Sequence, residues 1–266
     1  MLIVVHIMGK LVRMLNKPTD FVASLAKGLK VIEAFRAERP RLAVVDVAKA
    51  TGLDRATARR CLLTLNALGY ADYDGKFFSL TPRILRLGMG ALATLPLPQI
   101  VQPWLDQLSE QIGQSTSVAI LDETEVVYIA RAAQKRVMAV GLMPGSRLPA
   151  HATSLGRVLL AALPMNEARA LVERADLTPR TVRSLTTPAE IMAELARVRE
   201  QGHAIIDQEV EIGLRSIAVP VLDARGRTVA ALNTGVAAVQ AGPEDLARDY
   251  LPALLKVQEG LRRVLH

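Results

Sequence analysis

Apolar residues recur at three- and four-residue steps in the first regular segment of the chain, residues 21–37. This spacing predicts a helix with one buried face. Pro40 ends the pattern, because a residue that precedes proline disfavours the helical conformation. Two more helices are expected over residues 44–50 and 55–68, and Gly52 between them suits the left-handed residue that often follows a helix. The residues assigned to the buried face of the first helix are Val22, Leu25, Leu29, Ile32 and Phe35.

Two short strand patterns, residues 70–73 and 76–80, flank the dipeptide Asp74-Gly75. Asp-Gly between alternating runs is a strong hairpin signal. A helix, a short helix, a turn with glycine, a third helix and a hairpin follow one another in a winged helix-turn-helix. We therefore predict a mainly α winged helix-turn-helix over residues 21–80.

A further helical pattern begins near Thr81 and ends at the Pro96/Pro98 pair, which we interpret as a linker helix over residues 81–98. Beyond it, residues 99–266 alternate between helix and strand patterns. Short turns join several adjacent strands, which favours an α+β domain on an antiparallel sheet over a parallel one. Helices are expected at 99–113, 154–163, 165–174, 188–201 and 243–265, and strands at 116–121, 126–132, 137–142, 203–207, 214–222 and 227–236.

The net charge of +7 is concentrated at one end of the chain. Residues 1–19 carry three basic side chains and no acid, and residues 20–86 carry 12 basic and 7 acidic ones. The remaining 180 residues sum to −1. This distribution indicates that the first third of the chain binds a polyanion, for which double-stranded DNA is the natural candidate.

The third predicted helix has an apolar stripe and a basic outer face. Arginine and threonine in its first two turns suit the major groove, where arginine pairs with guanine. Lys76 on the hairpin is placed to touch phosphate or the minor groove. The alternative is a three-helix bundle with a solvated basic face. The stripe is Ala58, Cys61, Leu62, Leu65 and Leu68, and the expected DNA-binding residues are Arg55, Thr57, Arg59, Arg60 and Lys76.

Composition excludes several classes of protein. Cys61 is the one cysteine of the chain, so an internal disulfide and a cysteine-based zinc cluster are excluded. No apolar run reaches the ~18 residues of a membrane span, so we expect a cytoplasmic protein without a membrane partner. Residues 1–20 precede the regular patterns and are expected to be a flexible extension, with Met8 and Met14 as alternative starts.

A candidate anion site lies where a polar loop, Thr153-Ser154, enters an apolar helix. Free backbone N–H groups and the helix dipole favour a carboxylate there. Ser154 also fits a simple helix cap. Arg147 and Arg215 offer partners for a carboxylate, although surface ion pairs explain them equally well. His151 is either a ligand contact or a structural residue.

An enzyme is the main competing class, because Ser154, His151 or His203, and Asp207 suggest a hydrolytic triad on paper. However, no G-x-S-x-G elbow surrounds the serine, and the chain has no phosphate-binding loop, dinucleotide fingerprint or His/Glu metal motif. We therefore expect no catalytic residue, cofactor or metal. A purely architectural DNA-binding protein would leave residues 99–266 unexplained.

Several runs along the chain resemble the IclR family of transcriptional regulators, from about Phe21 to the C-terminus. Within that family, residues 78–83 and 151–161 are most similar to regulators of aromatic acid breakdown through protocatechuate and β-ketoadipate. The runs that carry the family resemblance are 25–32 (LAKGLKVI), 47–53 (VAKATGL), 59–65 (RRCLLTL), 68–70 (LGY), 145–157 (GSRLPAHATSLGR), 202–204 (GHA) and 213–220 (GLRSIAVP).

The resemblance implies a GAF-like effector domain, a homodimer or tetramer, and control of a catabolic operon. Ile206 stands where some glyoxylate-responsive members carry an acid, which favours an apolar, aromatic effector such as protocatechuate or 4-hydroxybenzoate, or else β-ketoadipate. The alternative is a repressor that responds to a different small organic acid. The effector-binding residues expected on this basis are Ser154, Leu155, Ser216, Asn233 and Gly235, with His151 and Met138 as further contacts and Val140 and Leu142 as apolar wall.

Overall fold

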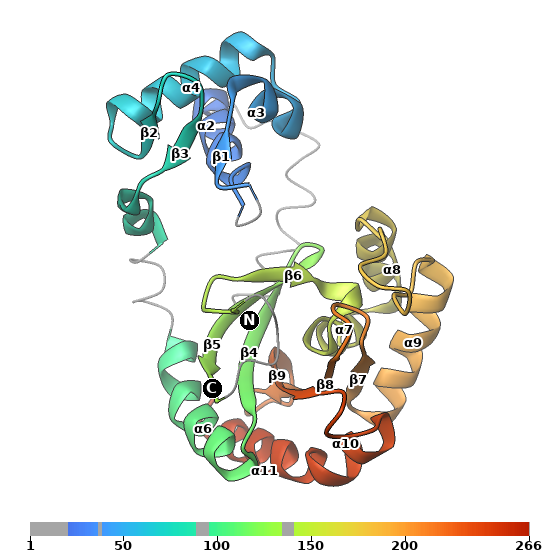
Figure 1. The fold of residues 1–266 in the computed structure, drawn as a ribbon. Coiled ribbons are helices and arrows are strands. Elements are labelled where there is room, and N and C mark those ends of the chain that lie inside the picture. Colours follow the sequence, from blue (N-terminus) through green and yellow to red (C-terminus); the bar gives the residue numbers. More distant parts are fainter. Residues whose placement is uncertain (1–20, 37–38, 89–95, 135–140, 266) are drawn as a thin grey trace. The chain divides into compact units, whose positions relative to one another are not determined.

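The computed structural model describes residues 21–36, 39–88, 96–134 and 141–265. The chain separates into two compact units, one within residues 8–95 and one that contains everything from Pro96 onward (Figure 1). Each unit has its own hydrophobic core. No helix of the described part is long and apolar enough to cross a bilayer.

The first unit packs three helices against a small sheet. Strand β3 is the centre of that sheet, and β1 and β2 pair with it in antiparallel fashion. The two-residue strand β1 was not expected, because it is too short to show alternation. The elements are α2 (Ala23–Glu33), β1 (Arg41–Leu42), α3 (Val44–Thr51), α4 (Arg55–Ala67), β2 (Ala71–Tyr73) and β3 (Phe78–Leu80).

The predicted buried face of the first helix is largely exposed. Val31 is the fully buried residue of α2, whereas Leu25 is 62% exposed and Leu29 is 48% exposed. Val22, just before the helix, is 59% exposed. The helix contacts the rest of its unit through Val31 and the partly buried Ile32. The prediction that Val22, Leu25 and Leu29 are buried is therefore wrong for a single chain.

The second unit is built on a six-stranded sheet in the order β6-β5-β4-β9-β8-β7. All neighbours are antiparallel, which confirms the predicted α+β domain. The strand expected over 137–142 falls mostly outside the described residues, and β6 was not expected. The strands are β4 (Ser115–Asp122), β5 (Glu125–Ala132), β6 (Arg147–Pro149), β7 (Ala204–Asp207), β8 (Leu214–Leu222) and β9 (Thr228–Ala237).

Helices cover both faces of this sheet (Figure 1). Adjacent strand residues point to opposite faces, so Val118 joins the cluster under α6 and α11 while Ala119 joins the cluster under α7, α8 and α9. The helices are α6 (Pro96–Ile112), α7 (Ser154–Ala161), α8 (Met165–Arg174), α9 (Pro188–Gln201), α10 (Pro243–Asp249) and α11 (Leu251–Arg262).

Prolines account for two differences from the expected helices. Helix α6 starts at Pro96 and not at residue 99, because the first turn of a helix tolerates proline. The single helix expected over 243–265 is broken at Tyr250, and Pro252 lies in the first turn of α11. Of the expected linker helix, the structure describes a 3₁₀ turn at Pro82–Ile84 and helical residues up to Gly88.

Candidate functional site

Helix α4 presents the predicted recognition surface. Asp54 caps its start, since the carboxylate accepts a hydrogen bond from the Thr57 amide at 2.8 Å, and this bond holds the pKa of Asp54 below its usual value. On the inner face Ala58, Leu62 and Leu65 are buried, as expected. Cys61 is partly buried.

The outer face of α4 differs from the prediction at two positions. Leu68, placed on the buried stripe, is 54% exposed because the helix ends just before it. Thr57, expected to face outward, is only 7% exposed, and its hydroxyl accepts a hydrogen bond from Arg60 at 3.3 Å. Three exposed cations remain on the first two turns of α4: Arg55, Arg59 and Arg60.

The hairpin between β2 and β3 is ordered by its own turn. The Asp74 carboxylate accepts hydrogen bonds from the amides of Lys76 and Phe77, at 3.0 and 2.8 Å, and both lower the pKa of Asp74. Tyr73 stacks on Phe78 with ring centroids 4.3 Å apart. Lys76 is exposed at the tip, which is the position that contact with a phosphate requires.

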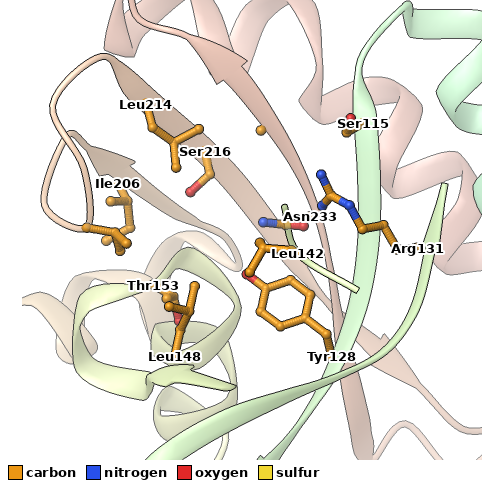
Figure 2. Close-up of a pocket in the computed structure, with 12 residues that line it drawn as sticks. Ser115, Tyr128, Arg131, Leu142, Leu148, Thr153, Ile206, Leu214, Ser216 and Asn233 are labelled. Carbon is orange, nitrogen blue, oxygen red and sulfur yellow. The ribbon is translucent and has the colours of Figure 1, made fainter. Parts of the chain in front are cut away.

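The second unit contains a pocket of about 560 Å³, part of which opens to solvent. Its walls come from strands β4 to β9, the residue that caps α7, and the segments before β6 and between β7 and β8 (Figure 2). The lining residues are Ser115, Tyr128, Arg131, Leu142, Leu148, Thr153, Ile206, Val210, Leu214, Ser216, Asn233 and Gly235.

One end of the pocket is polar. Arg131 and Tyr128 come from β5 and Asn233 from β9, and Figure 2 shows the three grouped at one side of the pocket. Arg131 donates a hydrogen bond to Ser117 at 2.8 Å. Burial lowers the pKa of this arginine from its usual value, but a guanidinium in a protein keeps its charge. Burial also raises the pKa of Tyr128 to about 12, so its phenol stays neutral.

The start of α7 forms another part of the wall. Thr153 lines the pocket and caps the helix, since its hydroxyl accepts the Gly156 amide at 3.0 Å. Ser154 is fully buried and donates to the hydroxyl of Ser216 at 2.9 Å. A Cβ on Gly156 would lie 2.1 Å from the carbonyl oxygen of Ala150. This position therefore requires glycine, which explains Gly156 in the first turn of α7.

The structure brings some of the predicted effector residues together and separates others. Ser216, Asn233 and Gly235 line the pocket, while Ser154 and Leu155 are fully buried and are not among the lining residues. Leu142, which was proposed for the apolar wall, lines the pocket, and so does Ile206, the position that favoured an apolar effector. Met138 and Val140 lie outside the described residues.

His151 lies away from the pocket. It is 4% exposed and its Nδ1 has no hydrogen-bond partner among the described residues. Burial and the charge of Arg157 lower the pKa of His151, so the ring stays neutral near pH 7. This placement favours the structural interpretation of His151 over the ligand contact.

The two arginines considered for a carboxylate are occupied elsewhere. Arg147 pairs with Asp122 and Glu125, each at 2.8 Å. Arg215 pairs with Asp207 at 2.5 Å. Neither lines the pocket. Arg131 was not among the residues predicted from the sequence, although it is the single charge in the otherwise apolar run Val126–Ala132, which was a usable signal.

The residues of the hypothetical hydrolytic triad do not meet. The Ser154 hydroxyl is bound to Ser216, and Asp207 is bound by Arg183 and Arg215. His203 contacts the carbonyl oxygen of Gln201. Among the described residues, no group of three or more His, Cys, Asp or Glu side chains is arranged to hold a metal ion.

Comparisons with known proteins agree with this architecture. Residues 24–75 match the IclR helix-turn-helix domain, and residues 89–260 match the domain described as bacterial transcriptional regulator IclR C-terminal. The chain is 43% identical over 243 residues to the Pca regulon regulatory protein of Pseudomonas putida, which covers 91% of this chain and 84% of that protein.

Two further relatives are named for hydroxybenzoates. The p-hydroxybenzoate hydroxylase transcriptional activator of Acinetobacter baylyi is 40% identical, over 92% of this chain and 93% of the relative. The solved inducer-binding domain of a PobR double mutant from Acinetobacter, in complex with 3-hydroxybenzoic acid, superposes with a TM-score of 0.60 and 36% identity, covering 63% of this chain and 98% of that one. The chain therefore belongs to the IclR family of bacterial transcriptional regulators.

Proposed function

We propose that this regulator controls genes for the breakdown of aromatic acids, and that the pocket binds a hydroxybenzoate-type effector such as protocatechuate or 4-hydroxybenzoate. The observation that carries the proposal is Arg131, the one charged side chain among the lining residues of a pocket whose other walls combine aliphatic side chains with hydroxyl and amide groups. Burying a carboxylate requires a compensating charge or donors, and arginine supplies both. The names of the relatives support the same chemical class.

The geometry favours one orientation of such a ligand. The carboxylate faces Arg131 and Asn233, and the ring lies against Leu142, Leu148 and Ile206. This reverses the orientation expected from the sequence, which placed the carboxylate at the start of α7. At that helix start the Thr153 hydroxyl already accepts a hydrogen bond from the Gly156 amide, and the Ser154 hydroxyl already donates one to Ser216. In the reversed pose, the hydroxyls at the α7 and β8 walls meet a ring hydroxyl of the effector.

The DNA contacts proposed for the first unit are Arg55, Arg59 and Arg60 on α4 and Lys76 on the hairpin. Arginines on the first turns of a recognition helix read guanine in the major groove, whereas a hairpin lysine binds phosphate without sequence preference. Double-stranded operator DNA is therefore the proposed partner. An effector changes DNA binding only if it binds the two conformations of the protein with different affinities.

Calorimetric titration of the full chain tests the ligand class. We expect protocatechuate or 4-hydroxybenzoate to release heat, and a ligand at about 100 times its dissociation constant to add ~2.7 kcal/mol to the free energy of unfolding. The neutral 4-hydroxybenzyl alcohol is the matched control for the carboxylate. Heat from glyoxylate or pyruvate but from neither aromatic acid would instead support the alternative of a different small organic acid. Heat from β-ketoadipate alone would be consistent with control of aromatic acid breakdown, but it would show that the effector is not aromatic.

We further propose a homodimer held by exposed apolar residues of α2 and of the two positions just before it (Phe21, Val22, Leu25 and Leu29), because exposed apolar surface of this kind marks an interface. Two recognition helices at fixed spacing are also what a palindromic operator requires. The variant Leu25→Glu/Leu29→Glu is expected to sediment as a smaller species than the natural chain. The control is Val182→Glu, at a 97% exposed position of the other unit. An unchanged assembly in the double variant would show that α2 is not the interface.

A further inference from the structure

The segment between β7 and β8 forms one wall of the pocket. Ile206 and Leu214 lie at its two ends and Val210 at its middle, and all three line the pocket. Gln208 adopts a left-handed conformation with φ of 63°, which is uncommon for a residue other than glycine. The chain therefore bends sharply at this position, and some interaction must hold the bend in place.

A buried ion pair sits directly behind this wall. Glu209, the neighbour of Val210, accepts a hydrogen bond from the Arg157 guanidinium at 2.6 Å. The side chain of Arg157 is 2% exposed and that of Glu209 is 9% exposed. Arg157 is itself fixed, because its Nε donates to the carbonyl oxygen of His151 at 2.9 Å. The pair thus ties the wall to α7, the helix whose first residues border the same pocket.

A second set of hydrogen bonds ties the wall to the loop between α8 and α9. The Thr181 hydroxyl donates to the carbonyl oxygen of Gln208 at 2.7 Å. The Ser184 hydroxyl donates to the carbonyl oxygen of Glu209 at 2.8 Å. The Leu185 amide donates to the Glu209 carboxylate at 3.4 Å. Glu209 is therefore the point at which α7, this loop and the pocket wall meet.

We propose that Arg157 and Glu209 are positioning residues that hold the 207–213 segment against the pocket and so set how tightly the effector is retained. Neither side chain lines the pocket, so they act through Val210 and its neighbours. A buried ion pair adds little net stability compared with an apolar pair, because desolvation offsets the attraction. The hydrogen bonds of the ion pair are directional, however, and they hold the 207–213 segment in one position. The identity of the effector rests on the function proposed above. The role of Arg157 and Glu209 in holding the 207–213 segment does not depend on it.

The variant Glu209→Gln tests this role, because it keeps the size of the side chain and removes its charge. We expect amide hydrogens of residues 208–213 to exchange about tenfold faster in the ligand-free protein, which corresponds to ~1.4 kcal/mol of easier local opening. We also expect faster dissociation of 4-hydroxybenzoate. Thr181→Val, which removes one hydroxyl from the second set of bonds, should act in the same direction with a smaller effect and serves if Glu209→Gln does not fold.

The matched control is Asp223→Asn. Asp223 is also a buried carboxylate paired with an arginine, Arg227 at 2.5 Å, but it lies in the β8–β9 turn and does not line the pocket. It should leave exchange at 208–213 and effector dissociation unchanged. Unchanged exchange in Glu209→Gln, or equal acceleration in the control, would overturn the proposal. Failure of the natural chain to bind any hydroxybenzoate would overturn the ligand class alone, and the exchange rates would still decide the role of the pair.

Discussion

Replacing both Arg59 and Arg60 with alanine is expected to abolish specific operator binding without unfolding the chain. Both side chains are exposed on the outer face of α4, opposite the buried residues Ala58 and Leu62. A bidentate arginine–guanine pair discriminates against the wrong base by about 1–3 kcal/mol, so losing two would remove most of the preference for the operator. Exposed substitutions of this kind usually change stability by no more than about 0.5 kcal/mol.

Binding is best measured on operator and on random DNA at several salt concentrations. Loss of base contacts lowers affinity for the operator alone. Loss of phosphate contacts lowers affinity for both and reduces the salt dependence by about one charge for each arginine. The control is the variant Arg262→Ala/Arg263→Ala, which removes two exposed arginines from the C-terminal region. Operator binding that survives in the α4 variant, or falls equally in the control, would contradict the assignment of α4 as the recognition helix.

Local signals explain why the helices and strands were predictable. Helix α9 was expected over residues 188–201 and occupies them, because Thr187 and Glu190 form a capping box and Gly202 ends the helix with φ of 76°. Strand β8 was expected over 214–222 and occupies those residues. In each case the information lies within a few residues of the boundary, so a pattern read along the chain is sufficient.

The pocket was less predictable, because its walls come from distant parts of the sequence. Ser216 lines the pocket, and its hydroxyl is bonded to that of Ser154, which lies 62 positions earlier in the chain and just behind the wall. Alternation along β5 indicates a strand but does not reveal which face borders a cavity, so Tyr128 and Arg131 were missed. His151 shows the opposite limit, since the sequence left it open as a ligand contact or a structural residue, and the structure places it outside the residues that line the pocket.

The first helix illustrates a different limit. Periodicity in Val22, Leu25 and Leu29 correctly indicates an apolar stripe but does not say what covers it. In a single chain these residues are exposed. The apolar pattern of a sequence reflects which residues are buried in the functional assembly. That these residues follow a buried pattern but are exposed in one chain therefore supports the proposed second copy of the chain.

Substitution of Arg131 by glutamine is expected to weaken binding of 4-hydroxybenzoate by about 2–5 kcal/mol, the usual cost of removing one partner of a buried charge pair. The reason is that the carboxylate would lose its counter-charge inside the pocket. The Asn233 amide and the Tyr128 phenol would remain as neutral donors on that side of the pocket. Arg131→Lys should restore part of the affinity, since it returns the charge without the planar geometry.

Comparison of two ligands separates loss of this contact from general damage to the pocket. Calorimetry should show a large loss for 4-hydroxybenzoate and a small one for 4-hydroxybenzyl alcohol, because the alcohol has no charge to neutralise. Arg147→Gln is the matched control, as this arginine pairs with Asp122 and Glu125 and does not line the pocket. Equal losses for both ligands would mean that Arg131 shapes the pocket without binding the carboxylate. Full retention of 4-hydroxybenzoate binding in Arg131→Gln would return the carboxylate to the start of α7, where the sequence first placed it.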